Sequence, residues 1–406
     1  MSHALPDGWR WVELGSVAVQ RSSKFDPQAN GETVPYVALE HLEPYVNRVG
    51  QYAASVDATS LKSRFFAGDI LFGKLRPYLR KVARTHFDGV CSTDILVFFN
   101  TDQIDGDYLL YVAESDSFIE YAVSTSAGTK MPRTSWEQLE DYSFPLPPLN
   151  EQRRIAAVLR DADASITRVE EAICAAQEVK RGVMRRVFTY GMGGEDTPTQ
   201  HTPIGEIPAG WEIVKLENCV RSPITYGIVQ AGPHFENGIP YIKTGDMTGG
   251  KLELSQLQRT APEIAASYSR SSVQAGEIVF ALRGNVGTVL EVPSELEGAN
   301  LTQGTARIAP SLRINNVYLL WALQSNCVRD EINRNTKGTT FVEITLARLR
   351  ELLIPLPPRE EQREIAALLQ SHDTAIRAMQ AEAARLRELK RGLMQGLLSG
   401  EIRTSP

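Results

Sequence analysis

Two stretches of the chain carry the spacing of apolar positions that is typical of a helix paired with another helix. Apolar or small residues recur at alternating steps of three and four through 159–187 and again through 369–397. Such a narrow seam suits helix pairing better than it covers a broad core. The predicted pairing positions are Leu159, Ile166, Val169 and Ile173 in the first stretch and Leu369, Ile376, Met379 and Leu386 in the second. The pattern predicts an intramolecular coiled coil, and two independent helices lying on their own domains are the alternative.

A lysine and a glycine interrupt both seams at the same place. The first seam has Lys180 and Gly182, and the second has Lys390 and Gly392. Glycine inside a helix costs about 1 kcal/mol relative to alanine. Its recurrence predicts that a second backbone approaches closely at this point.

The two helical stretches belong to a longer internal repeat. Residues 145–184 and 355–394 align without a gap, with 18 of 40 positions identical. Each copy opens on Pro-Leu-Pro-Pro, followed by Glu-Gln-Arg and Ile-Ala-Ala. Proline disfavours helix in the residue before it, so each long helix is expected to begin just after the prolines. A repeat of this length indicates a tandem duplication.

A globular domain precedes each predicted helix. Short apolar stretches separated by Gly, Pro and Asn predict strands, and a few helices lie between them. Residues 67–72 match 275–280 as a turn that leads into a strand. The fold class is therefore expected to be α+β. The predicted segments are a domain at 1–144, a helix at 145–190, a linker at 191–207, a domain at 208–354, and a helix with a tail at 355–406.

Composition excludes several classes of protein. The chain has 406 residues and a formal net charge of −6. No stretch approaches 18 consecutive apolar residues, so no conventional membrane-spanning helix is expected. The first residues lack the basic and apolar segments of a secretory signal. The four cysteines are scattered, which indicates free thiols in a reducing compartment. A cytoplasmic protein is expected.

The sequence shows no active site. The glycine-containing segment 283–287 lacks the lysine of a phosphate-binding loop, and the six histidines lie far apart. No Gly-x-Ser-x-Gly motif is present. Asp69 and Glu277 follow matched turn glycines, where a carboxylate is more often a turn residue than a catalytic acid. The prediction is no catalytic residue, no metal site and no cofactor bound by this chain.

Charge distribution favours contact with DNA more than the net charge does. Residues 62–86 carry seven Lys or Arg and one acid, whereas residues 251–313 carry six of each sign. Arg and Lys can bind phosphates, and Arg can also bind guanine with two hydrogen bonds. The candidate DNA-binding residues are Lys74, Arg76, Tyr78, Arg80, Lys81 and Lys130 in the first copy and Arg283, Asn285, Thr302, Gln303, Lys337 and Thr339 in the second. Solvated basic hairpins and ordinary turns are the alternatives.

The chain resembles the specificity subunits of type I restriction–modification systems over nearly its whole length. The resemblance rests on 145–157 and 355–367, on Lys180–Met184 and Lys390–Met394, and on the Gly-Glu-Ile-Arg ending at 400–403. Residues 67–82 and 275–289 also resemble the glycine, acid and strand segment of that family. Both copies occur in the same order, which makes the combination specific.

The resemblance implies a mechanism. Two target-recognition domains would each read one half of a split double-stranded DNA sequence, and an antiparallel coiled coil would set the spacer. Two modification subunits would use S-adenosylmethionine to methylate adenine N6, after the base leaves the stack. The full complex would add two restriction subunits that use ATP and Mg²⁺. The subunit itself would have no catalytic activity.

Two other functions are weighed against this one. A non-catalytic coiled-coil scaffold that binds protein partners is disfavoured by the unbalanced charge of residues 62–86. A solitary nuclease or methyltransferase is disfavoured because neither copy supplies a nucleotide or metal site.

Overall fold

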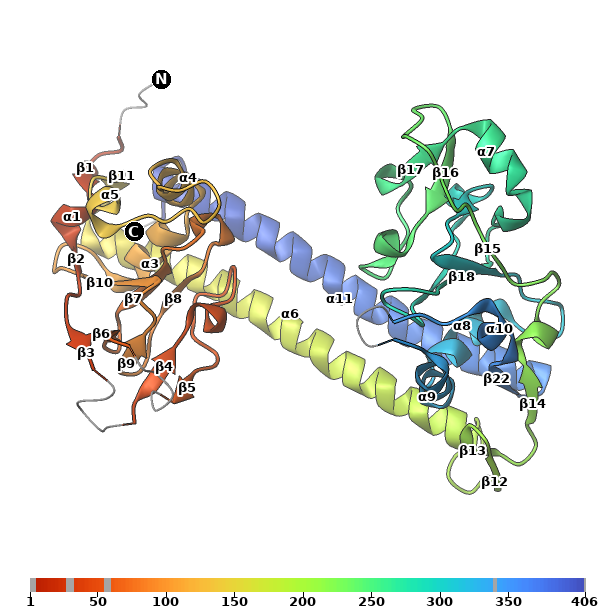
Figure 1. Cartoon of the computed structure of the whole chain (residues 1–406). Coiled ribbons are helices and arrows are strands. Elements are labelled where there is room, and N and C mark those ends of the chain that lie inside the picture. The colour runs from red at the N-terminus through yellow and green to blue at the C-terminus, as the bar shows by residue number, and fades with distance from the viewer. Residues whose placement is uncertain (1–4, 27–32, 55–59, 339–341, 405–406) are drawn as a thin grey trace. The chain divides into compact units, whose positions relative to one another are not determined.

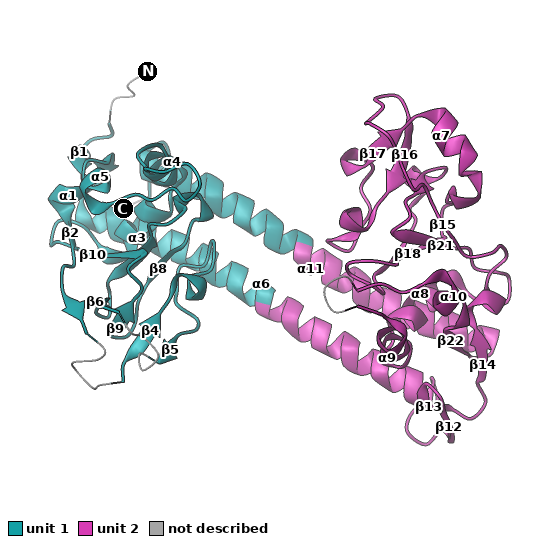
Figure 2. Cartoon of the chain, viewed as in Figure 1, with its two compact units in different colours: residues 1–170, 381–406 teal, residues 171–380 magenta. Residues whose placement is uncertain are grey.

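The chain folds into two compact units, which Figure 2 colours separately. The structure is a computed structural model that describes residues 5–26, 33–54, 60–338 and 342–404. Unit 1 comprises residues 1–170 and 381–406, and unit 2 comprises residues 171–380. The long helices α6 (Leu149–Tyr190) and α11 (Arg359–Ser399) each contribute to both units. The units therefore cut across the segments expected from the sequence.

Unit 1 is built on three small sheets (Figure 1). Its strands are β1 (Arg10–Glu13), β2 (Ala18–Gln20), β3 (Lys24–Phe25), β4 (Pro35–Val37), β5 (Ala53–Ala54), β6 (Lys62–Phe65), β7 (Ile70–Gly73), β8 (Val82–Arg84), β9 (Gly89–Cys91), β10 (Ile95–Asn100) and β11 (Ser143–Leu146). The sheet orders are β1-β11, β2-β10-β7-β8 and β3-β6-β9-β4-β5. The helices before α6 are α1 (Leu14–Val17), α3 (Gly106–Glu114), α4 (Asp116–Ser124) and α5 (Trp136–Leu139).

Unit 2 contains the corresponding elements. Its strands are β12 (Thr199–Thr202), β13 (Gly205–Pro208), β14 (Glu212–Lys215), β15 (Thr225–Tyr226), β16 (Ile239–Ile242), β17 (Gln258–Thr260), β18 (Ile278–Ala281), β19 (Val289–Glu291), β20 (Asn300–Leu301), β21 (Thr305–Ile308) and β22 (Leu353–Leu356). The sheet orders are β12-β13, β14-β22, β15-β21-β18-β19 and β17-β16-β20. The helices before α11 are α7 (Pro262–Ser267), α8 (Asn316–Gln324), α9 (Asn326–Asn335) and α10 (Leu346–Glu351).

The duplication extends beyond the aligned helices into the sheets. The four-stranded sheet has the same order in both units, and β4 pairs with β9 in parallel as β16 pairs with β20. In both units the strand before the long helix pairs antiparallel with the first strand of its domain. The α+β fold class is confirmed. The segment expected as a linker, 191–207, carries most of the β12–β13 hairpin.

The cores explain why each helix belongs to both units. In unit 1 the main core gathers Trp9 and Leu159 from the first copy with Met394 and Leu397 from α11. In unit 2 the core joins Leu369 of α11 to other side chains, including Val187 and Phe188 of α6 and Trp211 of the domain. The start of each helix thus packs on its own domain, and its end packs in the core of the other copy.

Within each unit the two helix segments run antiparallel. In unit 1, Asp163 contacts Lys390 and Glu170 contacts Arg387, so numbers rise along α6 as they fall along α11. In unit 2, Lys180 contacts Asp373. Among the predicted pairing residues, Leu159, Ile166, Leu369 and Ile376 are buried, and Val169, Ile173, Met379 and Leu386 are half-buried.

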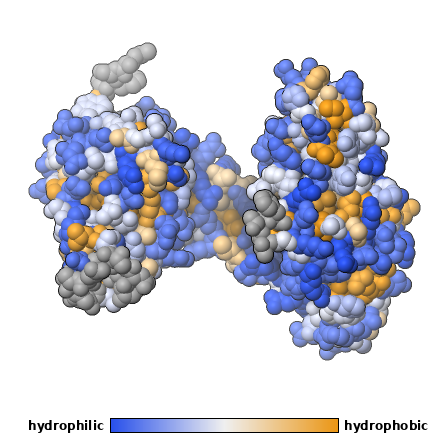
Figure 3. Space-filling model, in the orientation of Figure 1, coloured by the Kyte–Doolittle hydropathy of each residue, from blue (hydrophilic) through white to orange (hydrophobic). Residues whose placement is uncertain are grey.

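The expectation of close backbone approach at the two interior glycines is wrong. A Cβ atom placed on Gly182 or Gly392 would meet no heavy atom within 4 Å. Both glycines are exposed because they lie on the outer side of their helices, away from the pairing seam. None of the described helices combines the length and the apolar character needed to cross a membrane. On the face drawn in Figure 3, hydrophobic residues are scattered among hydrophilic ones in each unit.

Candidate nucleic-acid interface and the joints that support it

The repeated Glu-Gln-Arg phrase ties each domain to the first turns of its long helix. In unit 1 the Trp9 indole Nε1 donates to Glu151 Oε2 at 3.0 Å. In unit 2 the Trp211 Nε1 donates to Glu361 Oε2 at 2.9 Å. Hydrogen bonds to a carboxylate are stronger than those between neutral groups. The tryptophan at the start of each domain is therefore anchored to a glutamate of the long helix that lies more than 140 residues further along the chain.

The glutamine of the same phrase holds a second helix. Gln152 Oε1 accepts the backbone N–H of Asp105 at 2.7 Å, and Gln362 Oε1 accepts that of Asn315 at 2.8 Å. Asp105 and Asn315 are the N-cap residues of α3 and α8. The glutamine amide nitrogens donate to the proline carbonyls just before the long helices. The recurring phrase thus orients α3 and α8 relative to the long helices.

Lys390 lies in a buried polar cluster of unit 1, which we call joint 1. Its Nζ lies 2.6 Å from Asp163 Oδ1 and donates to Glu114 Oε2 at 3.2 Å. The Nζ also lies 5.2 Å from the centroid of the Tyr111 ring, whose hydroxyl donates to Asp163 at 2.9 Å. Glu114 Oε1 is buried and has no hydrogen-bond partner among the described residues. Joint 1 therefore holds two carboxylates against one ammonium group.

Burial controls the proton affinities in joint 1. It raises the pKa of Glu114 to about 7, although the nearby Lys390 favours the ionised carboxylate. Burial alone would lower the pKa of Lys390, but Glu114 and Asp163 raise it. Glu114 therefore takes up a proton near neutral pH while Lys390 stays charged.

The matching cluster in unit 2, joint 2, has one carboxylate fewer. Lys180 Nζ donates to Asp373 Oδ1 and lies 4.1 Å from the centroid of the Trp321 ring. Arg377 Nη2 lies 2.8 Å from Asp373 Oδ2. Gln324 ends α8 at the place where Glu114 ends α3. Joint 2 therefore keeps the lysine, the aspartate and an aromatic ring, but replaces the second acid by an amide.

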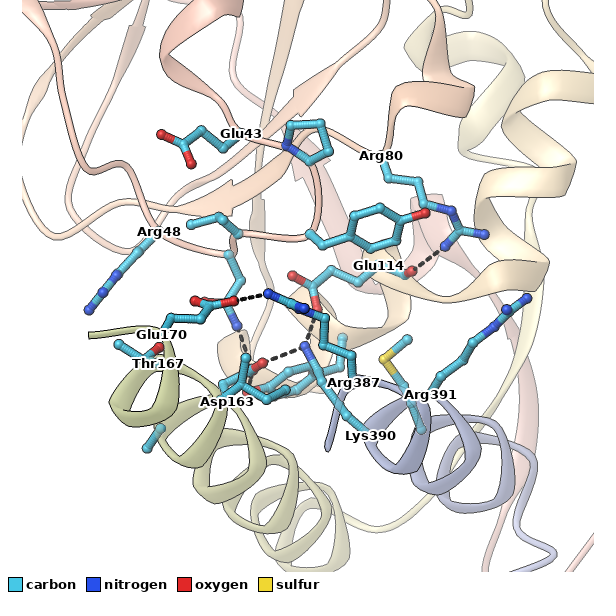
Figure 4. A pocket seen from close by; sticks show the side chains of 18 of the residues that line it. Glu43, Arg48, Arg80, Glu114, Asp163, Thr167, Glu170, Arg387, Lys390 and Arg391 are labelled. Atoms are coloured by element: carbon cyan, nitrogen blue, oxygen red, sulfur yellow. Dashed lines mark hydrogen bonds and ion pairs between the residues drawn. The ribbon is translucent and has the colours of Figure 1, made fainter. Parts of the chain in front are cut away.

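A cleft of about 1420 Å³ opens beside joint 1 (Figure 4). Its labelled side chains include Arg48 from the domain, Glu170 from α6 and Arg391 from α11. The basic residues that line it are interspersed with Glu43, Glu170 and other acids, so the cleft has no single sign of charge. It therefore does not by itself identify a ligand.

The two predicted loops of the first copy lie together in unit 1. Leu75 and Ala127 both form β-bridges with Arg133, so the loop after β7 and the loop after α4 share one neighbour. Lys74, Arg76 and Lys130 make no side-chain hydrogen bond or ion pair among the described residues, and Arg76 and Lys130 are exposed. Tyr78 is also exposed. We call Lys74, Arg76, Tyr78, Lys130 and their neighbour Arg133 loop cluster 1.

Arg80 and Lys81 are used inside the domain. The Arg80 guanidinium forms an ion pair with Asp116 and lies 5.7 Å from the centroid of the Tyr45 ring. Lys81 Nζ donates to the Leu39 carbonyl at 2.7 Å. The basic charge of residues 62–86 is therefore partly neutralised by acids from distant parts of the chain.

Two residues of the same loop have an unusual backbone. Arg76 and Arg80 both have φ of 54°, in the left-handed region. A non-glycine residue there costs roughly 1–2 kcal/mol. The ion pair of Arg80 with Asp116 offsets this cost inside the domain, whereas Arg76 forms no ion pair with any residue that the structure describes.

Unit 2 assembles the equivalent loops in the same way, which we call loop cluster 2. Arg283 and Lys337 both form β-bridges with Glu343. Arg283 Nε lies 3.1 Å from Glu343 Oε2, so its charge is partly neutralised. Asn285 and Lys337 are exposed. Thr339 lies outside the described residues.

The turn between β20 and β21 lies beside loop cluster 2. The Leu282 N–H donates to the carbonyl of Gly304 at 2.8 Å, which joins this turn to the loop after β18. Thr302 is half-buried and its N–H donates to Ile242 O at 3.1 Å, whereas Gln303 is exposed. Gln303 therefore has the freer side chain of the two.

The matched acids Asp69 and Glu277 are buried structural residues. Asp69 accepts two hydrogen bonds from Arg21, at 2.6 and 2.7 Å. Glu277 accepts from Arg307 at 2.6 and 2.7 Å and also pairs with Arg221. Both carboxylates are held in place by guanidinium groups from other segments of the same domain. Within the described ranges, no group of His, Cys, Asp or Glu is arranged to bind a metal ion.

A family model described as "Type I restriction modification DNA specificity domain" matches residues 6–176 and 208–388. The chain belongs to this family. It is therefore a DNA specificity subunit of a type I restriction–modification complex, as the sequence predicted, and its role is targeting rather than catalysis. The two matched ranges coincide with the two copies of the repeat.

Relatives extend the likeness over most of the chain. The chain is 29% identical to the type I restriction enzyme MjaVIII specificity subunit of Methanocaldococcus jannaschii, over 83% of this chain and 77% of that protein. It is 26% identical to the putative MjaX specificity subunit of the same organism, over 98% of this chain and 95% of that protein.

Two solved structures share the fold. A chain from a study of complex assembly and conformational transition of the type I R-M system has a TM-score of 0.62 and 25% identity, covering 99% of this chain and 100% of that chain. The S subunit from M. genitalium has a TM-score of 0.57 and 14% identity, covering 98% and 97%. The duplicated α+β architecture of this specificity subunit is thus the fold of its structural relatives.

Sequence reasoning did not predict the Trp–Glu contacts or the hydrogen bonds and ion pairs of joints 1 and 2. Glu151 and Glu361, and likewise Asp163 and Asp373, are identical positions of the repeat, which was the available signal. Trp9 and Trp211 also recur at the start of the two copies, whereas Glu114 has no such signal because the second copy has Gln324 at that place.

Proposed function

We propose that each globular domain of this specificity subunit reads one half of a split double-stranded DNA target. The observation that carries the proposal is the same loop cluster at the same place in both copies of the four-stranded sheet, with exposed Arg or Lys side chains in each. Loops of this kind can present side chains to base edges and phosphates. Membership in a DNA specificity family supports the choice of DNA as the ligand.

The paired helices set the unread spacer between the two half-sites. Helix α6 has 42 residues, which corresponds to about 63 Å at 1.5 Å per residue. Helix α11 has 41 residues and runs antiparallel to α6 within each unit. The Glu-Gln contacts hold each domain on the first turns of its helix, so helix length would translate into a constant gap.

Loop clusters 1 and 2 supply the DNA contacts. In the first domain the free cations Lys74, Arg76 and Lys130 and the exposed Tyr78 are the principal contacts. In the second domain the contacts are Arg283, Asn285, Thr302, Gln303, Lys337 and Thr339. Arg80 and Lys81 contribute less, because both side chains already bind groups of their own domain.

The partners supply the chemistry. Two modification subunits bind this chain and use S-adenosylmethionine to methylate adenine N6, after the target base leaves the stack. In the full complex two restriction subunits add ATP- and Mg²⁺-dependent translocation and cleavage. The complex acts in the cytoplasm, where its DNA is found.

Salt-dependent binding to duplex DNA tests the proposal against the scaffold alternative. The full chain, with its modification subunits, is titrated against DNA at about 50–200 mM salt, a range over which phosphate contacts change the affinity strongly. We expect affinity to fall steeply with salt and to depend on sequence. Binding to modification subunits without any affinity for duplex DNA would favour the scaffold instead.

A further inference from the structure

Arg76 occupies a backbone position at which the second copy of the repeat has glycine. The N–H of Lys74 bonds the Asp94 carbonyl as the N–H of Leu282 bonds that of Gly304. Two residues further on, Arg76 has φ of 54° and Gly284 has φ of 69°. Glycine adopts this conformation without strain, whereas arginine does not. The first domain therefore has a strained arginine at a position where the second domain has an unstrained glycine.

No side-chain contact within the described ranges compensates for the backbone strain at Arg76. Its side chain is exposed and makes no hydrogen bond or ion pair within the described part of the chain. Arg80, in the same loop and the same conformation, differs because it is paired with Asp116. Strained residues of this kind gather at functional sites. We therefore take the exposed guanidinium of Arg76 as the functional group for which the strained backbone is kept.

The backbone around Arg76 is held in place. Its N–H donates to the Pro132 carbonyl at 2.8 Å, and its own carbonyl accepts the N–H of Leu79 at 2.9 Å. The preceding Leu75 forms a β-bridge with Arg133. These contacts fix the backbone position from which the Arg76 side chain extends. A fixed position favours hydrogen bonds to a base edge, which depend on geometry. Phosphates can be met by the flexible Lys74 and Lys130 nearby, at no cost in backbone strain.

We infer that Arg76 is a specificity-determining residue that binds one guanine of the first half-site through its O6 and N7 atoms in the major groove. This two-pronged pairing is the commonest specific contact that arginine makes with DNA. The inference rests on the proposed function, since it requires that the first domain read DNA. It adds the base, the groove and the single side chain responsible.

The second domain has no side chain at the matching backbone position. Gly284 offers no side chain at the matching position, and the adjacent Arg283 is paired with Glu343. Glu343 corresponds in the repeat to Arg133, whose guanidinium pairs with Asp94 at 3.2 Å, so the ion pair of the first loop does not involve Arg76. The guanine contact of Arg76 is therefore confined to one half-site of the target.

The test compares two substitutions at Arg76 in the full chain bound to its modification subunits. Arg76→Gly installs the residue found at the matching position and removes the strain, so the variant should fold at least as well as the wild type. Arg76→Lys keeps the positive charge but loses the planar fork. Each protein is used to select binding sites from a randomised duplex library, and the preferred duplex is then remade with 7-deazaguanine at each guanine in turn.

We expect both variants to lose preference for guanine at one and the same position, on the order of 10- to 100-fold, with the other half-site unchanged. The wild type should lose a similar factor with 7-deazaguanine at that position, whereas Arg76→Gly should be indifferent to it. Tyr45→Gly is the control for relief of backbone strain alone, because Tyr45 also has a left-handed φ of 64° and belongs to neither loop cluster, although its ring lies 5.7 Å from the Arg80 guanidinium. Its base preferences should match those of the wild type.

Two other results would overturn the inference. A uniform loss of affinity over all sequences in Arg76→Gly, rescued by Arg76→Lys and accompanied by a shallower salt dependence, would make Arg76 a phosphate contact. Unchanged selection in both variants would remove Arg76 from the interface. If the wild type enriches no motif at all, the proposed function fails. If the wild type enriches a motif that the variants do not alter, only the inference about Arg76 fails.

Discussion

Lys180 and Lys390 occupy the same place in the repeat, yet they meet different surroundings. Lys180 in joint 2 faces one aspartate and the ring of Trp321. Lys390 in joint 1 faces the matching aspartate, the ring of Tyr111 and one additional carboxylate, Glu114. Both copies therefore keep the lysine–aspartate pair that connects the two long helices, while the residue that ends the domain helix is Glu114 in the first copy and Gln324 in the second.

The comparison separates what pairs the helices from what attaches a domain to them. The lysine–aspartate pair links one long helix to the other within each unit. Glu114 belongs to α3, so its bond to Lys390 links the first domain to α11. We expect the attachment of the first domain to depend more strongly on pH than the attachment of the second domain.

Removal of the lysine should have the largest effect. Lys390→Met leaves Glu114 and Asp163 buried without their cation, and should lower the free energy of unfolding by about 3–5 kcal/mol. Lys180→Met should cost less, about 1–3 kcal/mol, because Asp373 keeps Arg377 within 2.8 Å. Hydrogen exchange of the α3 and α8 amides, measured as a function of urea concentration, reports the stability of unit 1 and unit 2 separately. Equal losses in the two variants would contradict the difference drawn between the joints.

The titration of Glu114 should have the next largest effect. Its pKa is about 7 in the folded chain and near 4.5 when unfolded, so the folded state binds the proton more tightly. The stability that protonated Glu114 provides is complete below about pH 4.5 and is lost as pH rises through about 7. The loss is on the order of 3 kcal/mol.

Glu114→Gln should remove this dependence in unit 1. The glutamine copies Gln324 of joint 2, so the variant should keep the packing of the cluster. Stability is measured between pH 5 and 8 by hydrogen exchange of α3, with α8 of the same molecules as the internal reference. The same pH dependence of exchange in α3 and α8 of the wild type would contradict this prediction. So would a Glu114→Gln variant whose α3 keeps the pH dependence of the wild type.

The anchoring glutamates should give a smaller difference. Glu151 accepts from Trp9 and also pairs with Arg403, whereas Glu361 accepts from Trp211 and from the backbone of Met192. Glu151→Gln should therefore couple to Arg403→Ala in a double-mutant cycle by about 0.5–1 kcal/mol. The same Arg403→Ala change combined with Glu361→Gln is the control. Additive effects in both cycles would show that the Arg403 pair contributes nothing.

The smallest effect should be the same in both copies. Gly182→Ala and Gly392→Ala each place a methyl group in open space on a helix, so each should raise stability by about 0.5–1 kcal/mol. Thermal unfolding of the two variants and of the double variant checks this. A decrease in either single variant would show that the added carbon meets an obstacle.

The sequence could predict the parts of the fold that repeat locally. The apolar seam gave both long helices, and Pro147 and Pro148 placed the start of the first close to Leu149, where it begins. The turn glycines at 68 and 276 preceded β7 and β18 as expected. These features depend on short-range backbone preferences, which are legible in the order of residues.

The rest depends on partners that are distant in sequence. The acid that neutralises Arg80 is Asp116, and the acceptor of Lys81 is the Leu39 carbonyl, so a count of local charge overstated the basic surface. The strained backbone of Arg76 is stabilised by the carbonyl of Pro132, which no local pattern reveals. The open surroundings of Gly182 likewise follow from the way the helix faces its partner, not from its sequence.

Mapping of N6-methyladenine in cells that produce this chain with its modification subunits tests the central claim most directly. We predict a motif with two halves and a constant gap, absent without the chain, in which substitutions in loop cluster 1 alter one half and substitutions in loop cluster 2 alter the other. A continuous motif, or two halves that both change when a single cluster is altered, would contradict the claim that each domain reads its own half.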